Sequence, residues 1–273
     1  MISNVCVKAE RWTIRSFADI IIGMESYPNP PIREALLDIR VVLPEETTME
    51  VLSQFQDEIK DRFPIKEERT SWKGRLQFKP GSPPEFVDPD SCPEGFLFRS
   101  DTGKKIAQAR KNGFTFNKLK PYGRPYGSWS EFQPEAKGLW EHFVRVARPK
   151  NITRLALRYI NCIELPLPIG DFKDYLLTTP EVAKGVPQEL AKFFMQLVVP
   201  KGTSGLIANV TETMESIDKD KNVLPFIFDI DVYRNVNLAP SDKLIWEIFE
   251  ELRSYKNMIF KKSVTHKCEE LFK

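Results

Sequence analysis

Two aspartates separated by a single residue, Asp229 and Asp231, are the side chains whose type and spacing could most directly do chemistry. In an extended strand the stretch "FIFDIDVYR" places both carboxylates on one face, because successive side chains alternate between the two faces. Carboxylate oxygens arranged in this way can hold a divalent cation such as Mg²⁺. The pattern assures no third carboxylate, and the sequence has no glycine-rich phosphate loop, so we predict neither a metal nor a cofactor.

Charged residues also stand inside two other apolar strand patterns, "RLALRYINCIEL" (154–165) and "ALLDIRVVLP" (35–44). Alternation puts Arg158 in the first stretch, and Asp38 and Arg40 in the second, opposite to the apolar face of each strand. If these strands share one sheet, its helix-free face collects a cluster of charges, namely Asp38, Arg40, Arg158, Asp229 and Asp231.

Two interpretations of this face stay open. Asp–Arg pairs across neighbouring strands are common on half-buried sheet faces, because charges there need partners, and the cluster is then architectural. Alternatively the face binds a ligand, with Arg40, Arg158, Asp229 and Asp231 as contact residues. A paired, neutral face favours architecture, whereas convergent carboxylates favour metal chemistry.

A second candidate binding segment is "NKLKPYGRPYGSW" (117–129), in which basic and aromatic residues are interleaved before a predicted helix. Its candidate contact residues are Lys118, Lys120, Tyr122 and Arg124. Basic groups with aromatic rings beside free helix amides suit a phosphate group or a nucleic-acid strand. The alternative is a turn-rich loop whose aromatic rings pack onto the edge of the sheet.

Composition narrows the classes of protein that fit. Of 273 residues, 41% are hydrophobic and 29% charged, and a formal net charge of +2 gives no overall field that would attract nucleic acid. Four scattered cysteines without a CxxC pair, and two histidines, leave little material for a zinc site or a hydrolase triad. The run "ADIIIGM" is too short to cross a bilayer, so we expect a cytoplasmic protein without a membrane partner.

The elements that position these residues follow from periodicity and turn signals. The first part of the chain predicts a strand, a helix with a Thr47–Glu50 capping box, a strand, a proline-rich loop, a β-meander and a helix, at 35–44, 47–63, 71–80, 81–95, 95–119 and 128–149. The second part predicts a strand, two helical segments, two strands and a helix, at 152–165, 171–179, 187–199, 204–215, 224–235 and 241–260.

The two parts are alike in sequence, which indicates an internal repeat. A strand ending in Leu-Pro opens each part, and a Trp-Glu-x-Phe helix follows, as "GLWEHF" (138–143) and "LIWEIF" (244–249). We therefore predict an α+β fold made of a tandem pseudo-repeat of β-α-β(n)-α units, which forms a curved, mainly antiparallel sheet with helices on one face. This element order resembles that of the TATA-binding protein, an analogy that by itself implies no function.

The predicted organisation has three parts. The two α+β halves, 27–150 and 151–273, form one globular unit. Residues 1–26 have mixed polarity and no clear partner pattern, and we expect a poorly ordered N-terminal extension. Met24 precedes the first convincing element and could be the natural start, although a docked N-terminal arm fits the same residues.

Several segments resemble, in order, the hallmarks of a sporadically distributed family of roughly 250-residue prokaryotic proteins. They are "NPPIREALLDIRV", "PYGSWSEFQPEAKGLWEHF", "ITRLALRYINCIELP", "FDIDVY" and "LRSYKNMIFKKSVTHKCEELF". The resemblance covers about Tyr27 to Phe272 and leaves residues 1–23 outside its usual span. It implies no activity, and a sporadic distribution is typical of mobile defence or toxin–antitoxin systems.

From these observations we expect a non-enzymatic binding or regulatory protein that acts through a protein or nucleic-acid partner. The alternative is a metal-dependent enzyme that acts on nucleic acid or nucleotides with Asp229, Asp231 and Arg158 on the open sheet face. The charge balance of that face separates the two hypotheses.

Overall fold

Antiparallel strands dominate this computed structural model, which describes residues 27–77, 85–121 and 128–273. Within these ranges nine strands form a single sheet. In chain order they are β1 (Ile32–Val42), β2 (Ile65–Gln77), β3 (Glu85–Arg99), β4 (Lys105–Arg110), β5 (Gly113–Leu119), β6 (Asn151–Pro166), β7 (Phe194–Pro200), β8 (Ile207–Met214) and β9 (Val223–Leu238). The α+β class with a mainly antiparallel sheet is thereby confirmed.

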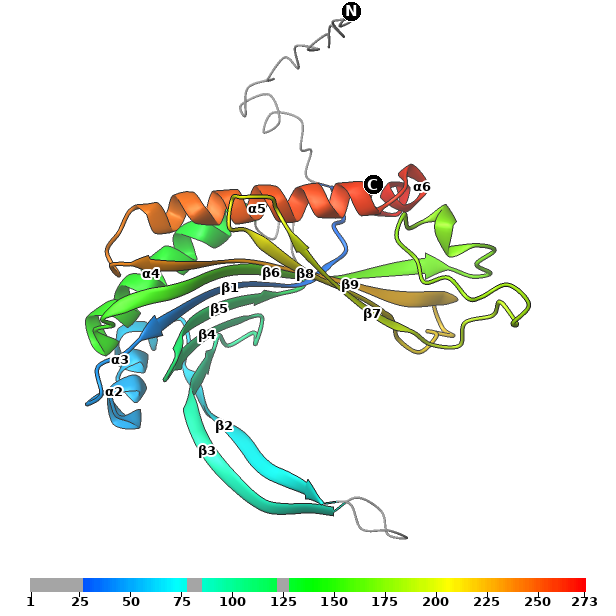
Figure 1. Cartoon of the computed structure of the whole chain (residues 1–273). Helices are drawn as coiled ribbons and strands as arrows, with labels where there is room; N and C mark the ends of the chain where they lie inside the picture. The colour runs from blue at the N-terminus through cyan, green and yellow to red at the C-terminus, as the bar shows by residue number, and fades with distance from the viewer. Residues whose placement is uncertain (1–26, 78–84, 122–127) are drawn as a thin grey trace, which may run out of the picture.

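The helices are α2 (Met49–Ser53), α3 (Phe55–Ile59), α4 (Trp129–Ala147), α5 (Leu244–Ser263) and α6 (His266–Glu269), with 3₁₀ turns η1 (Phe172–Asp174) and η2 (Glu270–Phe272). Figure 1 shows the sheet curling, with the long helices on its outer side and an open concave side below. The β2–β3 hairpin extends away from the rest of the sheet on the concave side. We call the helix-free side of the sheet the concave face.

The strand order is β2-β3-β4-β5-β1-β6-β9-β8-β7, so β1 and β6 lie at the centre. Leu37 of β1 faces Leu157 of β6, and both are fully buried under the helices. Their even-numbered neighbours, such as Asp38 and Arg158, therefore project from the concave face. The two central strands thus carry the core on one side and the candidate site on the other.

The helical stripes of the sequence supply the other half of the core. In α4 the predicted stripe is buried throughout, namely Phe132, Ala136, Leu139, Trp140, Phe143 and Ala147. The predicted helix at 47–63 is two short helices, because Gln54 interrupts it between α2 and α3. Its N-cap is Thr48, whose Oγ1 accepts a hydrogen bond from the Val51 N–H, so the predicted capping by Thr47 is wrong.

The predicted loop at 81–95 is wrong from residue 85 onward, where the chain is strand β3. Proline lacks an N–H and is tolerated in a strand at bulges and edges. Pro93 pairs with Thr70 next to a register shift, and Gly95 follows with a φ of +151°. A Cβ at Gly95 would lie 2.1 Å from the Ala109 carbonyl oxygen, so this residue allows β3 to approach β4.

The two helices predicted at 171–179 and 187–199 are also wrong. Only the single turn η1 forms in the first segment, and the second contains strand β7. Phe194, Val198 and Val199 give β7 the aromatic and β-branched composition that favours strands. The second half therefore lacks the helix between its first and second strands, and the two halves are not alike there.

The Trp-Glu-x-Phe segments adopt similar local geometry. Trp140 stacks on Phe143 and Trp246 stacks on Phe249, each with ring centroids 5.6 Å apart. Trp140 is only 2% exposed, whereas Trp246 is partly buried against the core. The two tryptophans therefore differ in burial, which does not support the equivalence of the two halves, and the tandem repeat remains a prediction.

Candidate binding surface on the concave sheet face

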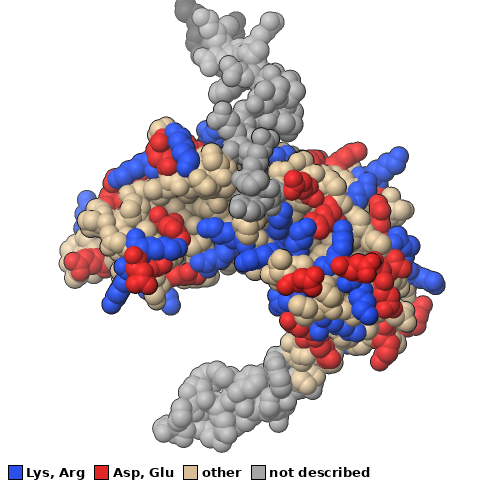
Figure 2. Space-filling model, turned by 180° about the vertical axis from the view of Figure 1, so that it is seen from behind, with Lys and Arg blue, Asp and Glu red and all other residues tan. Residues whose placement is uncertain are grey.

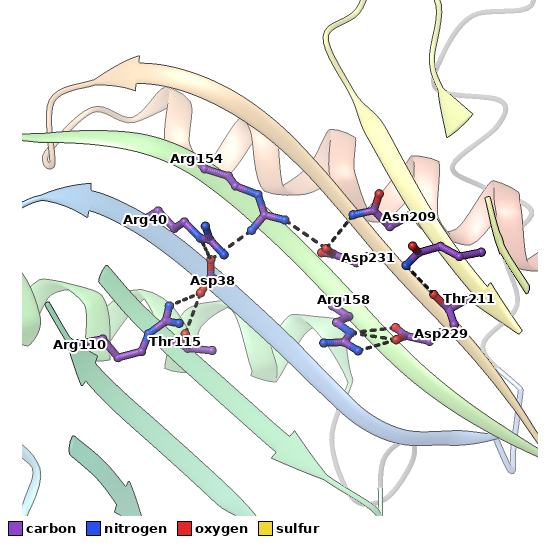
Figure 3. A network of polar contacts seen from close by, with 11 residues as sticks. Asp38, Arg40, Arg110, Thr115, Arg154, Arg158, Asn209, Thr211, Asp229 and Asp231 are labelled. Carbon is purple, nitrogen blue, oxygen red and sulfur yellow. Dashed lines mark hydrogen bonds and ion pairs between the residues drawn. The ribbon is translucent and has the colours of Figure 1, made fainter. Parts of the chain in front are cut away.

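The predicted charge cluster exists on the concave face, where Figure 3 shows it as a network that crosses several strands. Asp38 and Arg40 come from β1, Arg158 comes from β6, and Asp229 and Asp231 come from β9. The network also contains residues that the sequence analysis did not select, chiefly Arg110, Thr115, Arg154 and Asn209.

Arg154 is the hub of the network. Its Nη1 donates to Asp38 Oδ1 at 3.3 Å, and its Nη2 donates to Asp231 Oδ2 at 3.1 Å, so one guanidinium group joins β1 to β9. The group lies 4.4 Å from the Tyr233 ring centroid, a distance at which cation–π attraction contributes. Ala156, the next residue on this face of β6, is only 1% exposed although it lies outside the helix-covered core.

Asp38 also accepts hydrogen bonds from the strands that lie on the other side of β1 from β6. The Arg110 Nη2 and the Thr115 Oγ1, the latter at 2.9 Å, both donate to Asp38 Oδ2. Arg40 approaches more loosely, with its Nε 3.6 Å from Oδ1. Asp38 therefore connects β4 and β5 to the two central strands, and its charge is fully engaged by arginines.

Arg158 and Asp229 form the second part of the cluster. The Arg158 Nε donates to Asp229 Oδ1 at 2.9 Å and its Nη2 donates to Oδ2 at 2.5 Å, which is a bidentate pair. The hydrogen bonds to Asp229 raise the pKa of Arg158 above its usual value. Arg158 thus pairs with an aspartate of β9, as the architectural interpretation of this face predicts.

A row of amides extends the network toward the hairpin. Arg69 donates to Gln108 Oε1 at 3.1 Å, Gln108 donates to Asn117 Oδ1 at 2.9 Å, and Asn117 donates to Glu34 Oε1 at 2.6 Å. Gln108 and Asn117 are buried although they lie on the concave face. Alternation with Phe114 and Phe116 in "GFTFNKL" was the sequence signal that could have identified Asn117.

The three aspartates of the concave-face cluster are each paired with a neighbouring arginine. Asp231 bonds Arg154 and Asn209, and Asp229 bonds Arg158. Burial nevertheless raises the pKa of Asp231, against the lowering effect of Arg154. Among the described residues, no group of three or more His, Cys, Asp or Glu side chains is arranged to hold a metal ion. The face is a paired polar surface.

Of the four candidate contact residues of the second predicted segment, Lys118 and Lys120 are described, and Lys118 lies on the other face of the sheet. Lys118 is buried and follows Asn117 on β5, so it projects toward the helices, where burial and then the nearby Lys105 lower its pKa. Lys120 is exposed after the end of β5, at a cis peptide bond to Pro121. Tyr122 and Arg124 lie outside the described residues, as does the predicted extension at 1–26.

Charges of both signs are mixed on the side of the molecule that Figure 2 shows, which is opposite to the view of Figure 1. This matches the small formal net charge of +2. In the part of the chain that the structure describes, no helix is long and apolar enough to span a membrane.

Comparisons of the chain with models of protein families and with curated proteins gave no match. The similarity to a sporadically distributed prokaryotic family therefore stays a sequence-based hypothesis.

Proposed function

We propose that this chain is a non-enzymatic binding protein, and that a partner protein occupies the concave face of its sheet. The observation that carries the proposal is the state of the arginines there. Arg154 and Arg110 are largely buried in the network, whereas the side chains of Arg40 and Arg158 remain 50% and 45% exposed. The network therefore holds a rigid polar floor and presents guanidinium edges to a partner.

A protein partner fits this face better than a nucleic acid. Binding to phosphates draws on cations that are free to replace counterions. Here Arg158 is already held by both oxygens of Asp229, and Arg154 is shared between two aspartates. A surface that alternates charged, amide and hydroxyl groups is complementary to a mixed polar protein surface.

The metal-dependent alternative is less well supported. A cation held by Asp229 and Asp231 would have to displace the guanidinium groups of Arg158 and Arg154, which already bond these oxygens. The carboxylates in this arrangement stabilise the sheet and are not free to act as ligands. A metal-dependent enzyme is therefore the second candidate function.

The tandem repeat of the fold and the cellular setting of the protein are also proposals. We propose a tandem origin of the halves 27–150 and 151–273, supported by β5 lying beside β1 and β9 lying beside β6. The regulatory setting, a mobile defence or toxin–antitoxin type system in the cytoplasm, is supported by the sequence resemblance.

The proposal is tested by co-purification from the native host with two matched charge reversals. Arg40→Glu alters the concave face, where Arg40 makes one loose ion pair at 3.6 Å. Arg62→Glu is the control on the helix side, since Arg62 is 54% exposed and makes one ion pair with Glu135 at 4.0 Å. We expect a protein that co-purifies with the wild type and Arg62→Glu in fixed ratio and is lost with Arg40→Glu.

Mass spectrometry and nucleic-acid sequencing of the same samples identify the molecules that co-purify and so distinguish the possible outcomes. Retention of every co-purifying protein by Arg40→Glu contradicts binding at the concave face. Recovery of nucleic acid alone, lost with Arg40→Glu, would replace the protein partner by a nucleic-acid partner. Thermal melting of both variants checks that neither charge reversal unfolds the chain.

A further inference from the structure

The edge strand β7 carries apolar side chains on both of its faces. Phe194 is 69% exposed and Val198 is 63% exposed on the concave face, where the neighbouring Gln196 bonds Thr211. Leu197 is 40% exposed on the opposite face. Natural edge strands are commonly protected by charges or a bulge, and β7 contains neither a charged residue nor a register shift.

The backbone of β7 has one open side. The Lys201 N–H donates to Leu206 O, so odd-numbered residues of β7 point their backbone groups toward β8. The N–H and C=O groups of the even residues Phe194, Gln196 and Val198 therefore point away from the sheet. Among the described residues, no hydrogen bond reaches these outward groups.

The position of β7 is fixed by its pairing with β8 and by a hydrogen bond from α5. Pairing with β8 runs from Phe194 to Pro200 without a break, and the Tyr255 hydroxyl of α5 donates to Val199 O at 3.1 Å. An edge that is apolar, regularly paired with β8 and held by this hydrogen bond needs little reordering before it pairs with another strand.

We propose that β7 pairs with β7 of a second copy of this chain, in an antiparallel register centred on Gln196. Each pair of outward residues then exchanges two backbone hydrogen bonds, Gln196 with Gln196 and Phe194 with Val198 of the other copy. A register centred on Leu197 instead would place Phe194 opposite Pro200, which has no N–H to donate.

The side chains are self-complementary in this register. On the concave face Phe194 lies beside Val198 of the second copy, so the two most exposed apolar residues of the strand cover each other. On the helix side Met195 lies beside Leu197 of the second copy. A twofold axis repeats both pairings, as an isologous interface requires.

The flanking charges select antiparallel over parallel pairing. Lys192 and Lys201 bracket the strand. A parallel register would place each lysine beside the same lysine of the second copy, and like charges directly opposite are destabilising. The antiparallel register places Lys192 opposite Pro200 and Lys201 opposite Ala191, so no like charges meet.

The proposed interface between the two strands is small. A seven-residue strand is short beside the roughly 800 Å² per partner of a standard stable interface, so we infer a reversible, concentration-dependent dimer. The twofold axis is perpendicular to the sheet, which leaves both concave faces on the same side. The dimer is independent of the proposed partner, and either can fail without the other.

Single cysteines test the register. In the chosen pairing the two Cα atoms of residue 196 lie about 5.5 Å apart, inside the range of roughly 4.4–6.8 Å that a disulfide spans. The two Cα atoms of residue 198 lie roughly 14 Å apart, since four residues along the strand and one strand spacing across it separate them. Mild oxidation should therefore cross-link Gln196→Cys at least several-fold more than Val198→Cys or Phe194→Cys, with wild type as background for the native cysteines.

Sedimentation equilibrium over a range of concentrations gives a second measure. Gln196→Lys brings two lysines together only in this dimer and should weaken association at least about tenfold, which corresponds to about 1.4 kcal/mol. Gln54→Lys, at an exposed glutamine between α2 and α3, should leave it unchanged. A wild type that stays monomeric, a dimer that ignores Gln196→Lys, or equal cross-linking at all three positions overturns the proposal. Cross-linking of the edge only to another protein from the host overturns it as well.

Discussion

Arg158 lies directly opposite Asp231 in the β6–β9 ladder, yet its guanidinium group bonds Asp229, two residues away on the same strand. The diagonal pairing leaves Asp231 to Arg154, which lies four residues before Arg158 on the same face of β6. Both arginines thus lean in the same direction along the strand, and each aspartate of the Asp-x-Asp pair has its own cation.

The Arg158–Asp229 pair should stabilise the fold by an intermediate amount. Asp229 is only 12% exposed in its side chain and keeps its charge without a partner in Arg158→Met. We expect a loss of about 2 kcal/mol in the free energy of unfolding, between the values for exposed and for buried pairs. Urea denaturation of the purified protein measures it.

The double variant Arg158→Met with Asp229→Asn separates an architectural pair from a binding arginine. Because it removes both charges, it should recover part of the loss. Lys173→Met, which breaks an exposed pair with Glu181, serves as control and should change little. Unfolding curves for Arg158→Met that match the wild type would instead assign Arg158 to ligand binding alone.

Arg154→Met should cost more than Arg158→Met. The Arg154 side chain is 17% exposed and bonds both Asp38 and Asp231, so its removal leaves two poorly solvated carboxylates. We expect a loss of about 3 kcal/mol or more, typical of breaking a buried pair. The same urea experiment decides the order, and a smaller loss than for Arg158→Met would refute the role of Arg154 as hub.

Glu212 should make the stability depend on pH. This β8 residue is 2% exposed, its Oε2 has no hydrogen-bond partner, and burial raises its pKa from 4.5 to about 7. A raised folded pKa means that the stabilising contribution is complete below pH 4.5 and is lost as the pH rises to about 7. The carboxyl is therefore tolerated when protonated and destabilising when ionised.

Glu212→Gln removes this titration while keeping the shape. Relative to wild type, the variant should gain about 2–3 kcal/mol of stability between pH 5 and pH 8, from the size of the shift. Glu46 is exposed, so Glu46→Gln is the control and should match the stability of the wild type at both pH values. Parallel pH profiles for Glu212→Gln and wild type would show that Glu212 ionises normally in the folded state.

The two Trp-Glu-x-Phe segments should differ in their contribution. Trp140→Ala removes a buried ring whose Nε1 donates to Pro240 O at 3.1 Å, and should cost about 3–5 kcal/mol. Trp246→Ala should cost less than half as much, because Trp246 is only partly buried. Equal losses of stability in thermal melts of the two variants would show instead that both tryptophans act as equivalent core residues.

Periodicity predicted the parts of the fold where one face is buried. Alternation in β1, β6 and β9 separates core from polar residues cleanly, and this placed Asp38, Arg40, Arg158, Asp229 and Asp231 on one face. The α4 stripe was equally readable because its burial repeats with the helical period. In these elements local pattern and tertiary packing agree.

Sequence reasoning failed where tertiary pairing overrides local signals. Two of the prolines that indicated a loop, Pro89 and Pro93, occur in β3, where Pro93 adjoins a bulge and the outer end pairs with β2 alone. Residues 187–199 have spacings that suit a helix, yet β8 offers an edge to the β-branched end of the segment. Alternation alone puts the hub residue Arg154 on the face of Arg158, but its bonds to Asp38 and Asp231 depend on side-chain packing that spacing does not encode.

Site-specific photo-crosslinking in the native host tests the central claim, that the concave face holds a partner protein, most directly. A photoreactive amino acid is placed at Leu36 or Ile160 on the concave face, and at Lys137 or Arg145 on the outer surface of α4 as matched positions. The account predicts one discrete cross-linked protein at both concave positions and its absence at both helix positions. The same product at the helix positions, or none at the concave ones, would contradict it.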